Sequence, residues 1–296
     1  MKFSKFNMSK ISIIALYAIV GILVFACGST PTSKRVITVS IQPQKHILEK
    51  IVGDKFEITS LLSPGSNPEA YEPNLSHLMN LEKSEAYFRI GNIGFELAIV
   101  NKAKNNNPDL KIYDNSFGVD FIEGSHGATE DEAHRHEIDP HIWSSVPNMM
   151  KIAENMYNAI LQLDPKNKKY YTKNYNKVKQ NLMALNDSIA AKLLPLKGTA
   201  FAVWHPSLSY FARDYGLKQV SLEYDGKESS VKHLQKKIAE AKDKNIKIFF
   251  FQKEFDSKQA ETINEQIGAK MVSINPMNYN WQEEMLNTAN ALAGTK

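Results

Sequence analysis

Short apolar runs alternate with amphipathic stretches along most of the chain. Strands of a buried sheet are expected at residues 36–41, 56–62, 86–90, 110–113, 199–204, 220–222, 246–251 and 269–274. Helices are expected at residues 45–52, 95–103, 208–215, 230–242, 258–267 and 281–292. Alternation of this kind predicts parallel sheets that are covered by helices on both faces. Because the pattern restarts near residue 199, the expected fold class is α/β with two lobes.

One long amphipathic stretch separates the two series. Residues 165–195 contain no internal Pro or Gly, and positions 171, 175, 178, 182, 185, 189 and 193 are apolar or Tyr at spacings of three and four. About 28 helical residues make a rod roughly 42 Å long. Flexible linkers are rich in Gly, Ser or Pro, and this stretch is not. We therefore expect a lobe at 36–164, a rigid linking helix at 165–195, a second lobe at 196–296, and little motion between the lobes.

The first residues have the pattern of an export signal. Three lysines precede an apolar run at 11–25, which is shorter than the roughly 20 apolar residues of a membrane-spanning helix. Cys27 follows directly and is the only cysteine, so a disulfide framework is excluded. Cys27 is either the stray end of a signal peptide or an acylated N-terminus, and the Gly-Ser-Thr-Pro-Thr-Ser run after it favours lipidation. We expect a signal peptide at 1–26 that is removed, and a lipidated tether at 27–35 that anchors the exported protein to a bacterial membrane.

Composition narrows the class of protein further. The 296 residues are 43% hydrophobic and 23% charged, values that are ordinary for a soluble globular protein. The net charge is +4, and the predicted leader holds three lysines and no acid, so the remainder is nearly neutral at +1. A nucleic-acid partner calls for a clustered basic face, and none is evident in the sequence. We expect a monomer with no nucleic-acid partner.

Several polar residues fall where strands of the predicted sheets end. In open parallel sheets, ligands bind beyond the carboxyl ends of the strands. Glu69 follows the strand at 56–62, His141 lies in an Asp-Pro-His segment, and His205 directly follows the strand at 199–204. Gln252 and Asn275 follow two further strands. One carboxylate and two imidazoles that converge between the lobes would suit a divalent metal ion.

Other histidines carry less chemical information. His126, His134 and His136 lie in an acidic, irregular stretch at 123–137, which is either a low-affinity metal collector or a merely solvated loop. The remaining three histidines lie in or near expected helices and are interpreted as structural or exposed; they are His46, His77 and His233.

The motifs together resemble a known family, the zinc/manganese solute-binding lipoproteins of ABC importers. The similarity covers nearly the whole mature chain. Its most specific part is the segment Trp-His-Pro-Ser-Leu-Ser-Tyr-Phe at 204–211, followed by Asp-Tyr-Gly-Leu at 214–217. The resemblance implies two α/β lobes bridged by a rigid helix, a metal held at their interface and delivery of that metal to a membrane permease. It also implies that His141 and His205 are ligands and that 123–137 is a shortened His-rich loop.

The sequence departs from that family twice. Pro-Glu-Ala-Tyr-Glu-Pro at 68–73 has Glu69 where the family usually has His, and Asn275 stands where the family often has an acid. Both changes together keep the net charge of the ligand set at −1. The expected ligands are Glu69, His141 and His205, completed by water, by bidentate Glu69 or by Asn275, with Gln252 nearby. Zinc suits this set best, and Mn²⁺ or Fe²⁺ would need a more oxygen-rich one.

Two other functions use some of the same residues. Two histidines and a glutamate also describe zinc hydrolases, although the sequence has no His-Glu-x-x-His motif and no evident general base. Glu72 could be proposed as that base. Its Tyr-Glu-Pro segment is equally well explained as a structural turn. A carrier of siderophore, haem or cobalamin would leave His141 and His205 without a joint role. The expected function is therefore non-enzymatic capture of a divalent metal.

Overall fold

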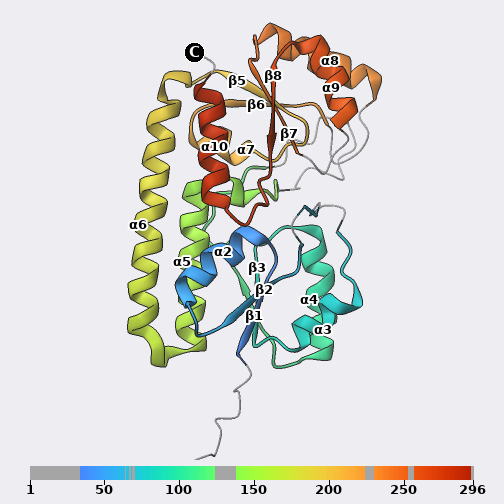
Figure 1. Cartoon of the computed structure of the whole chain (residues 1–296). Helices are drawn as coiled ribbons and strands as arrows, with labels where there is room; N and C mark the ends of the chain where they lie inside the picture. The colour runs from blue at the N-terminus through green and yellow to red at the C-terminus, as the bar shows by residue number, and fades with distance from the viewer. Residues whose placement is uncertain are drawn as a thin grey trace, which may run out of the picture. The chain divides into compact units, whose positions relative to one another are not determined.

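Two four-stranded parallel sheets form the centre of the structure, a computed structural model (Figure 1). It describes residues 34–63, 65–66, 68, 71–123, 138–223, 230–252 and 257–294. The first sheet has the order β2-β1-β3-β4 and the second the order β6-β5-β7-β8. The strands are β1 (Val36–Val39), β2 (Glu57–Ser60), β3 (Ala86–Arg89), β4 (Lys111–Asp114), β5 (Ala200–Val203), β6 (Lys218–Ser221), β7 (Ile248–Gln252) and β8 (Lys270–Ile274).

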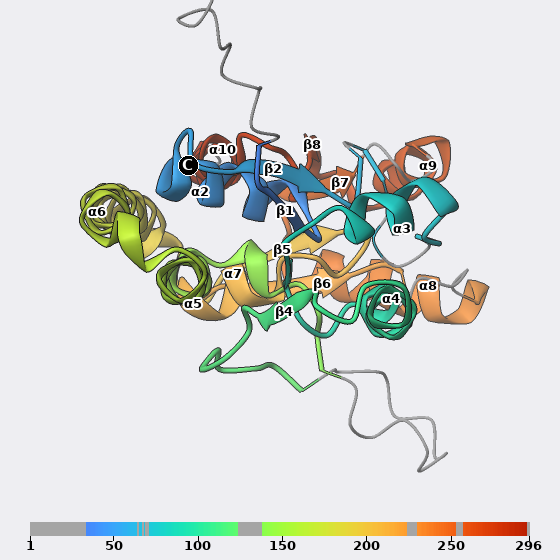
Figure 2. The ribbon, with the colours of Figure 1, turned by 90° about the horizontal axis from the view of Figure 1, so that it is seen from below.

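Helices connect the strands and cover the sheets (Figures 1 and 2). They are α2 (Gln42–Val52), α3 (Leu75–Glu82), α4 (Gly94–Asn106), α5 (Val146–Leu163), α6 (Lys168–Leu193), α7 (Ser209–Asp214), α8 (Val231–Asp243), α9 (Ser257–Ile267) and α10 (Trp281–Ala293). The expected α/β class with two lobes, two parallel sheets and one long helix between them is confirmed.

Polar side chains fix where several helices begin. Asn74 precedes α3, Ser145 precedes α5 and Ser230 precedes α8, and each accepts a hydrogen bond from the backbone N–H three residues on. Such caps satisfy one of the backbone donors that a first helical turn leaves without a partner. Pro43 in α2 and Pro147 in α5 stand in the first turn, where a missing N–H costs nothing.

Two helices were missed in the sequence. The larger is α5, whose buried positions Met149, Ile152, Met156, Ile160 and Leu163 recur at spacings of three and four, the same signal that identified the linking helix. The smaller, α3, buries one residue among its eight, so its sequence lacks an apolar stripe.

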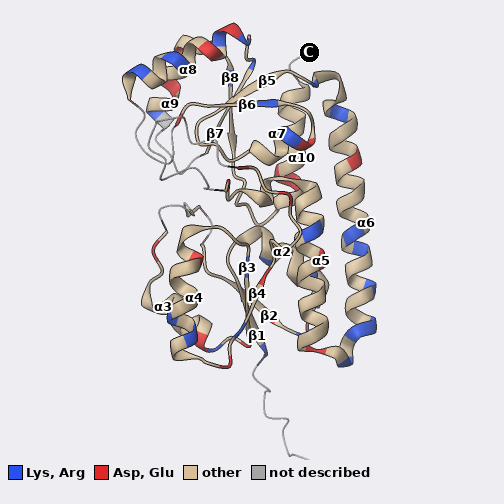
Figure 3. Ribbon diagram, turned by 180° about the vertical axis from the view of Figure 1, so that it is seen from behind, with Lys and Arg blue, Asp and Glu red and all other residues tan. Residues whose placement is uncertain are grey.

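Helix α6 joins the two lobes as expected. It packs against α2 and α5 on the first lobe and against α10 on the second (Figures 1 and 2). Of the seven expected stripe positions, six are buried and Leu185 is half-buried. Lysines occupy the opposite, exposed side of the helix (blue in Figure 3). The helix therefore has one face in the protein core and one in solvent.

A single hydrophobic cluster runs through both lobes. It includes Ile37 and Phe88 from the first sheet, Leu182 from α6, and Phe250 and Trp281 from the second lobe. A smaller cluster lies on the other face of the second sheet. Because one core spans the lobes and α6, moving one lobe against the other would open well-packed contacts. Little motion between the lobes therefore stays a prediction.

The expected signal peptide and residues 27–33 of the expected tether, Cys27 among them, lie outside the described residues, as do His126, His134, His136 and Glu69. Within the described part of the chain, no helix is both long and apolar enough to cross a membrane.

The buried face of α6 can be tested with two adjacent residues. Leu182 is completely buried in the shared core, whereas Met183 is 49% exposed. We expect Leu182→Ala to lower the free energy of unfolding by about 2–5 kcal/mol, because it leaves a cavity in a dense core. Met183→Ala should change it by less than about 0.5 kcal/mol. Urea denaturation measures both, and equal effects would contradict the assignment of the buried face.

Candidate metal centre

Two buried histidines meet where the lobes come together. His205 lies two residues beyond β5, and His141 immediately precedes a 3₁₀ turn at Ile142–Ser144. Each is 3% exposed. Their Nε2 atoms lie 3.1 Å apart, and the two rings are nearly perpendicular, with an interplanar angle of 73°. Two of the three residues predicted to bind metal therefore do lie side by side.

A carboxylate holds the other nitrogen of each ring. Asp139 Oδ1 lies 3.0 Å from His141 Nδ1, and Glu223 Oε2 lies 2.8 Å from His205 Nδ1. An ionised carboxylate can only accept a hydrogen bond, so each Nδ1 carries the proton and donates it. In a neutral imidazole the Nε2 atom then holds a lone pair. Carboxylate–histidine pairs of this kind orient metal-binding histidines in many proteins.

The Asp139 carboxylate is built to stay ionised. Burial alone would raise its pKa, but the hydrogen bond from the His141 ring, the charge attraction of that ring and the hydrogen bond from the His141 backbone outweigh burial and hold the pKa below its usual value. The His141 backbone N–H lies 2.9 Å from Asp139 Oδ1. The carboxylate therefore fixes both the backbone and the ring of the histidine two residues along.

The Nε2 atoms of His141 and His205 face each other at a distance that suits a shared positive charge. The two Nε2 atoms lie within hydrogen-bond distance at 3.1 Å, so a proton held between them links the two rings. A cation bound by both nitrogens could take the place of that proton. The pair is thus arranged to bind a positive charge, and its two carboxylates add negative potential from behind.

The other predicted site residues are placed differently. Asn275 Oδ1 accepts a hydrogen bond from the Met277 backbone N–H at 3.0 Å, and the Asn275 backbone N–H donates to Glu284 Oε1 at 2.7 Å, so this side chain shapes a turn. Gln252 is buried at the end of β7. Glu69 lies outside the described residues, and within those residues no group of three or more His, Cys, Asp or Glu side chains could hold a metal ion.

The structural histidines lie in helices. His46 is buried in α2, where its ring packs edge-on against Tyr279 at 4.8 Å. His77 lies in the first turn of α3, and the Asn74 backbone N–H donates to its Nδ1 at 3.3 Å. His233 lies in the first turn of α8. These positions agree with the structural interpretation from the sequence.

Sequence reasoning missed Glu223. The register of the second sheet could have found it, because β5 and β6 run parallel with Val203 opposite Ser221. Continuing that register by two residues sets His205 beside Glu223, and the Glu223 backbone N–H still bonds the Trp204 carbonyl at 3.0 Å. Aligning the ends of neighbouring parallel strands would have predicted that His205 and Glu223 lie side by side.

A second buried acid, Glu96, is not available to a metal. It accepts hydrogen bonds from the Ile90 and Gly91 backbone N–H groups at 2.7 and 2.8 Å and from the Ser40 hydroxyl. Complete burial raises its pKa to about 7, against the opposing effect of these hydrogen bonds. Its oxygens tie the carboxyl ends of β1 and β3 to the start of α4, which is a structural role.

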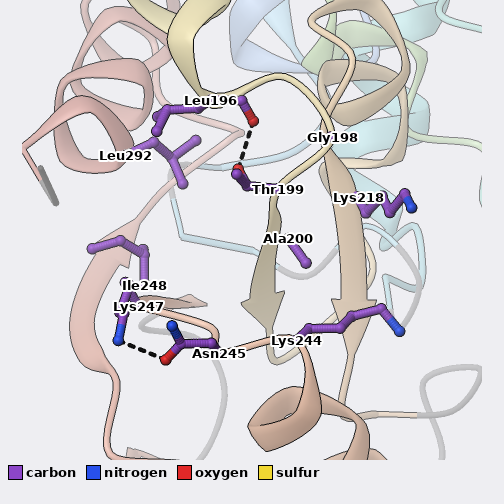
Figure 4. A pocket seen from close by; sticks show the side chains of 10 residues that line it. All are labelled: Leu196, Gly198, Thr199, Ala200, Lys218, Lys244, Asn245, Lys247, Ile248 and Leu292. Carbon is purple, nitrogen blue, oxygen red and sulfur yellow. Dashed lines mark hydrogen bonds between the residues drawn. The ribbon is translucent and has the colours of Figure 1, made fainter.

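A cavity of about 420 Å³ lies at the opposite edge of the second sheet, where β5, β6 and β7 begin (Figure 4). Lys218, Lys244 and Lys247 stand among its lining residues. Three ammonium groups repel a divalent cation, so this cavity does not suit a metal.

Solved structures share the two-lobed fold. One described as the crystal structure of ZnuA is 34% identical, has a TM-score of 0.81, and covers 88% of this chain and 99% of its own. FpvC of Pseudomonas aeruginosa in complex with Mn²⁺ has a TM-score of 0.77 at 24% identity, covering 88% of this chain and 98% of its own. The second likeness is one of fold.

Curated relatives agree with these structures. The high-affinity zinc uptake system protein ZnuA of Bacillus subtilis is 28% identical over 272 residues, which are 86% of this chain and 85% of that protein. The zinc-binding lipoprotein AdcA of Streptococcus pneumoniae is 26% identical over 91% of this chain and 56% of its own length.

The fold and the relatives define a class: the protein is the extracytoplasmic, metal-binding component of an ABC importer, and its partner is a permease. Such components are not enzymes, and neither the hydrolase nor the siderophore or haem alternative is favoured. The model of the family "Zinc-uptake complex component A periplasmic" matches residues 37–294, so the chain belongs to that family. The resemblance stated from the sequence is confirmed.

The role of Glu223 can be tested by an isosteric change. Glu223→Gln keeps the shape and an oxygen acceptor but removes the negative charge behind His205. We expect the affinity for a divalent metal to fall by about tenfold or more, since loss of such a partner typically costs 10–100-fold. Competition with a chelating dye measures this, and the exposed Glu261→Gln on α9 is the matched control. Equal affinities of the two variants would refute the role.

Proposed function

We propose that the protein captures Zn²⁺ outside the cytoplasmic membrane and delivers it to the permease, with Glu69, His141 and His205 as the protein ligands. The observation that supports this most is the pair of imidazoles with Nε2 atoms 3.1 Å apart and both Nδ1 atoms on carboxylates. Glu69 follows β2 in the first lobe, so the three ligands would come from three separate segments.

The spacing of the two nitrogens suits zinc. Tetrahedral zinc binds histidine nitrogens at 2.0–2.1 Å, which sets two such nitrogens about 3.3 Å apart. The observed 3.1 Å needs a change of only a few tenths of an ångström. The metal therefore enters a pair that is already oriented, and little binding free energy is spent on ordering the side chains.

The choice of zinc rests on ligand type. Two imidazoles and one carboxylate match known zinc sites, and Zn²⁺ binds nitrogen ligands more tightly than Mn²⁺ or Fe²⁺ does. The ZnuA and AdcA relatives are named for zinc, whereas FpvC was solved with Mn²⁺. Because the Asn275 oxygen already accepts a backbone hydrogen bond, we propose water or the second Glu69 oxygen as the fourth ligand, with Asn275 and Gln252 beside the site.

Two further parts of the proposal concern the membrane anchor and the histidines of the acidic stretch at 123–137. Cys27 carries a lipid that holds the protein at the outer face of a bacterial membrane, close to the permease, and the protein acts as a monomer. His126, His134 and His136, which lie among acidic residues, serve as a weak collector of zinc. The AdcA relative is named as a lipoprotein, which supports the anchor.

Binding can be tested by metal titration of single variants. We expect the wild-type protein to bind Zn²⁺ at one tight site and to melt at a higher temperature with zinc, because a ligand of the native state stabilises it by RT ln(1 + [L]/Kd). Glu69→Ala, His141→Ala and His205→Ala should each lose most of this shift. Elemental analysis of the proteins as purified gives a second measure.

His233→Ala, in α8, is the matched control and should keep the full zinc-dependent shift. A wild-type protein that melts at the same temperature with and without every divalent ion tested would overturn the proposed function. A full shift in His205→Ala would overturn the ligand set alone.

Anchoring can be tested at Cys27. Cys27→Ser removes the thiol that a lipid would modify and should move the protein from the membrane and detergent phase to the aqueous phase. Ser29→Ala, two residues along the tether, should stay with the membrane. Detergent phase separation of cell extracts distinguishes the two, and an unaltered distribution of Cys27→Ser would exclude lipidation.

A further inference from the structure

We propose that Tyr210 is a positioning residue of the metal centre, whose hydroxyl sets the place of His141 relative to His205. The inference rests on the proposed function. Tyr210 is completely buried in α7, five residues after His205. Its hydroxyl accepts a hydrogen bond from the Ile122 backbone N–H at 3.1 Å and donates one to the Asp139 carbonyl at 2.7 Å.

The hydroxyl takes the place of a backbone hydrogen bond. Glu123 and Ile138 form an isolated antiparallel bridge, and the Asp139 N–H bonds the Ile122 carbonyl at 3.0 Å. In a regular antiparallel pair the Ile122 N–H would return a bond to the Asp139 carbonyl. Here the Tyr210 oxygen stands between these two groups and bonds both. Removing the oxygen would let the two segments close directly on each other.

Asp139 links the Tyr210 hydroxyl to His141 through hydrogen bonds at its carbonyl and its carboxylate. Its carbonyl is held by Tyr210, and its carboxylate holds both the backbone N–H and the Nδ1 of His141. A movement of the Asp139 backbone therefore moves His141, and only one residue lies between them in sequence.

The same short helix makes further bonds to the segments that flank His141. Arg213 donates to the Asp120 carbonyl at 2.6 Å and stacks on the Tyr210 ring at 5.0 Å, and Asp214 bonds the Ser145 hydroxyl. Helix α7 thus bonds residues on both sides of His141 while its own chain leads back to His205. A fixed helix with an inserted hydroxyl is a spacer between the two imidazoles.

Tyr210→Phe tests the spacer because it removes one oxygen and keeps the ring in the core. We expect zinc affinity to fall by about tenfold or more, and the visible spectrum of the Co²⁺-loaded protein to change with the ligand geometry. In the metal-free protein, the imidazole NMR resonances of His141 should shift. Dye competition with Zn²⁺, Co²⁺ spectroscopy and histidine-selective NMR measure these.

Tyr215→Phe is the matched control, since Tyr215 follows the same helix, is buried, and bonds Asn186 Oδ1 of α6 at 3.1 Å, away from the centre. It should bind zinc within about twofold of wild type, with unchanged spectra and His141 resonances. If Tyr210→Phe behaves like Tyr215→Phe in all three measurements, the spacer role is wrong.

The readouts separate this inference from the proposed function. If the wild-type protein binds no zinc, the proposed function fails, and the metal-free His141 resonances still decide whether Tyr210 sets the position of that ring. Should Tyr210→Phe lower the melting temperature, the comparison with Tyr215→Phe is made at a temperature where both variants are folded.

Discussion

The candidate metal centre depends on two hydrogen bonds that fix the rings of His141 and His205. The carboxylates of Asp139 and Glu223 accept them from the two Nδ1 atoms, and the two Nε2 atoms then face each other. The folded chain holds the two nitrogens 3.1 Å apart, a distance that favours a cation between them. In the proposed site, metal affinity is thus prepared by hydrogen bonds to atoms that would not touch the metal.

The architecture supplies the rigidity that such a pair needs. His205 leaves the end of a parallel strand whose neighbours fix its direction, and His141 leads into the 3₁₀ turn before α5. Both segments border a hydrophobic cluster that continues through α6 into each lobe. Hydrogen bonds from α7, above all those of the Tyr210 hydroxyl, then adjust the position of His141 through Asp139. Apolar packing gives the coarse position and hydrogen bonds give the fine one.

Sequence patterns predicted the fold class well, because alternating strands and helices are local signals with distinct periods. The end of β5 pointed to His205, and the Asp-Pro-His segment pointed to His141. Neither their contact nor the partner of His205 followed from the pattern. Glu223 is eighteen residues from His205, and only the sheet register joins them. Tyr210 was hidden for a similar reason: in a motif it is one aromatic residue among several, and its hydroxyl matters only where two distant segments meet.

The shared core also limits how the metal can leave. A wide opening of the lobes would expose part of the hydrophobic cluster that spans them, and exposing apolar surface costs about 25 cal/mol per Å². Small changes at the centre cost far less. If His141 binds zinc as we propose, a shift of about 1 Å in its ring would be enough to weaken binding greatly, because zinc–nitrogen bonds tolerate only a narrow range of lengths. Release to the permease is therefore expected to act on the segments that position the histidines, while α6 and the core stay intact.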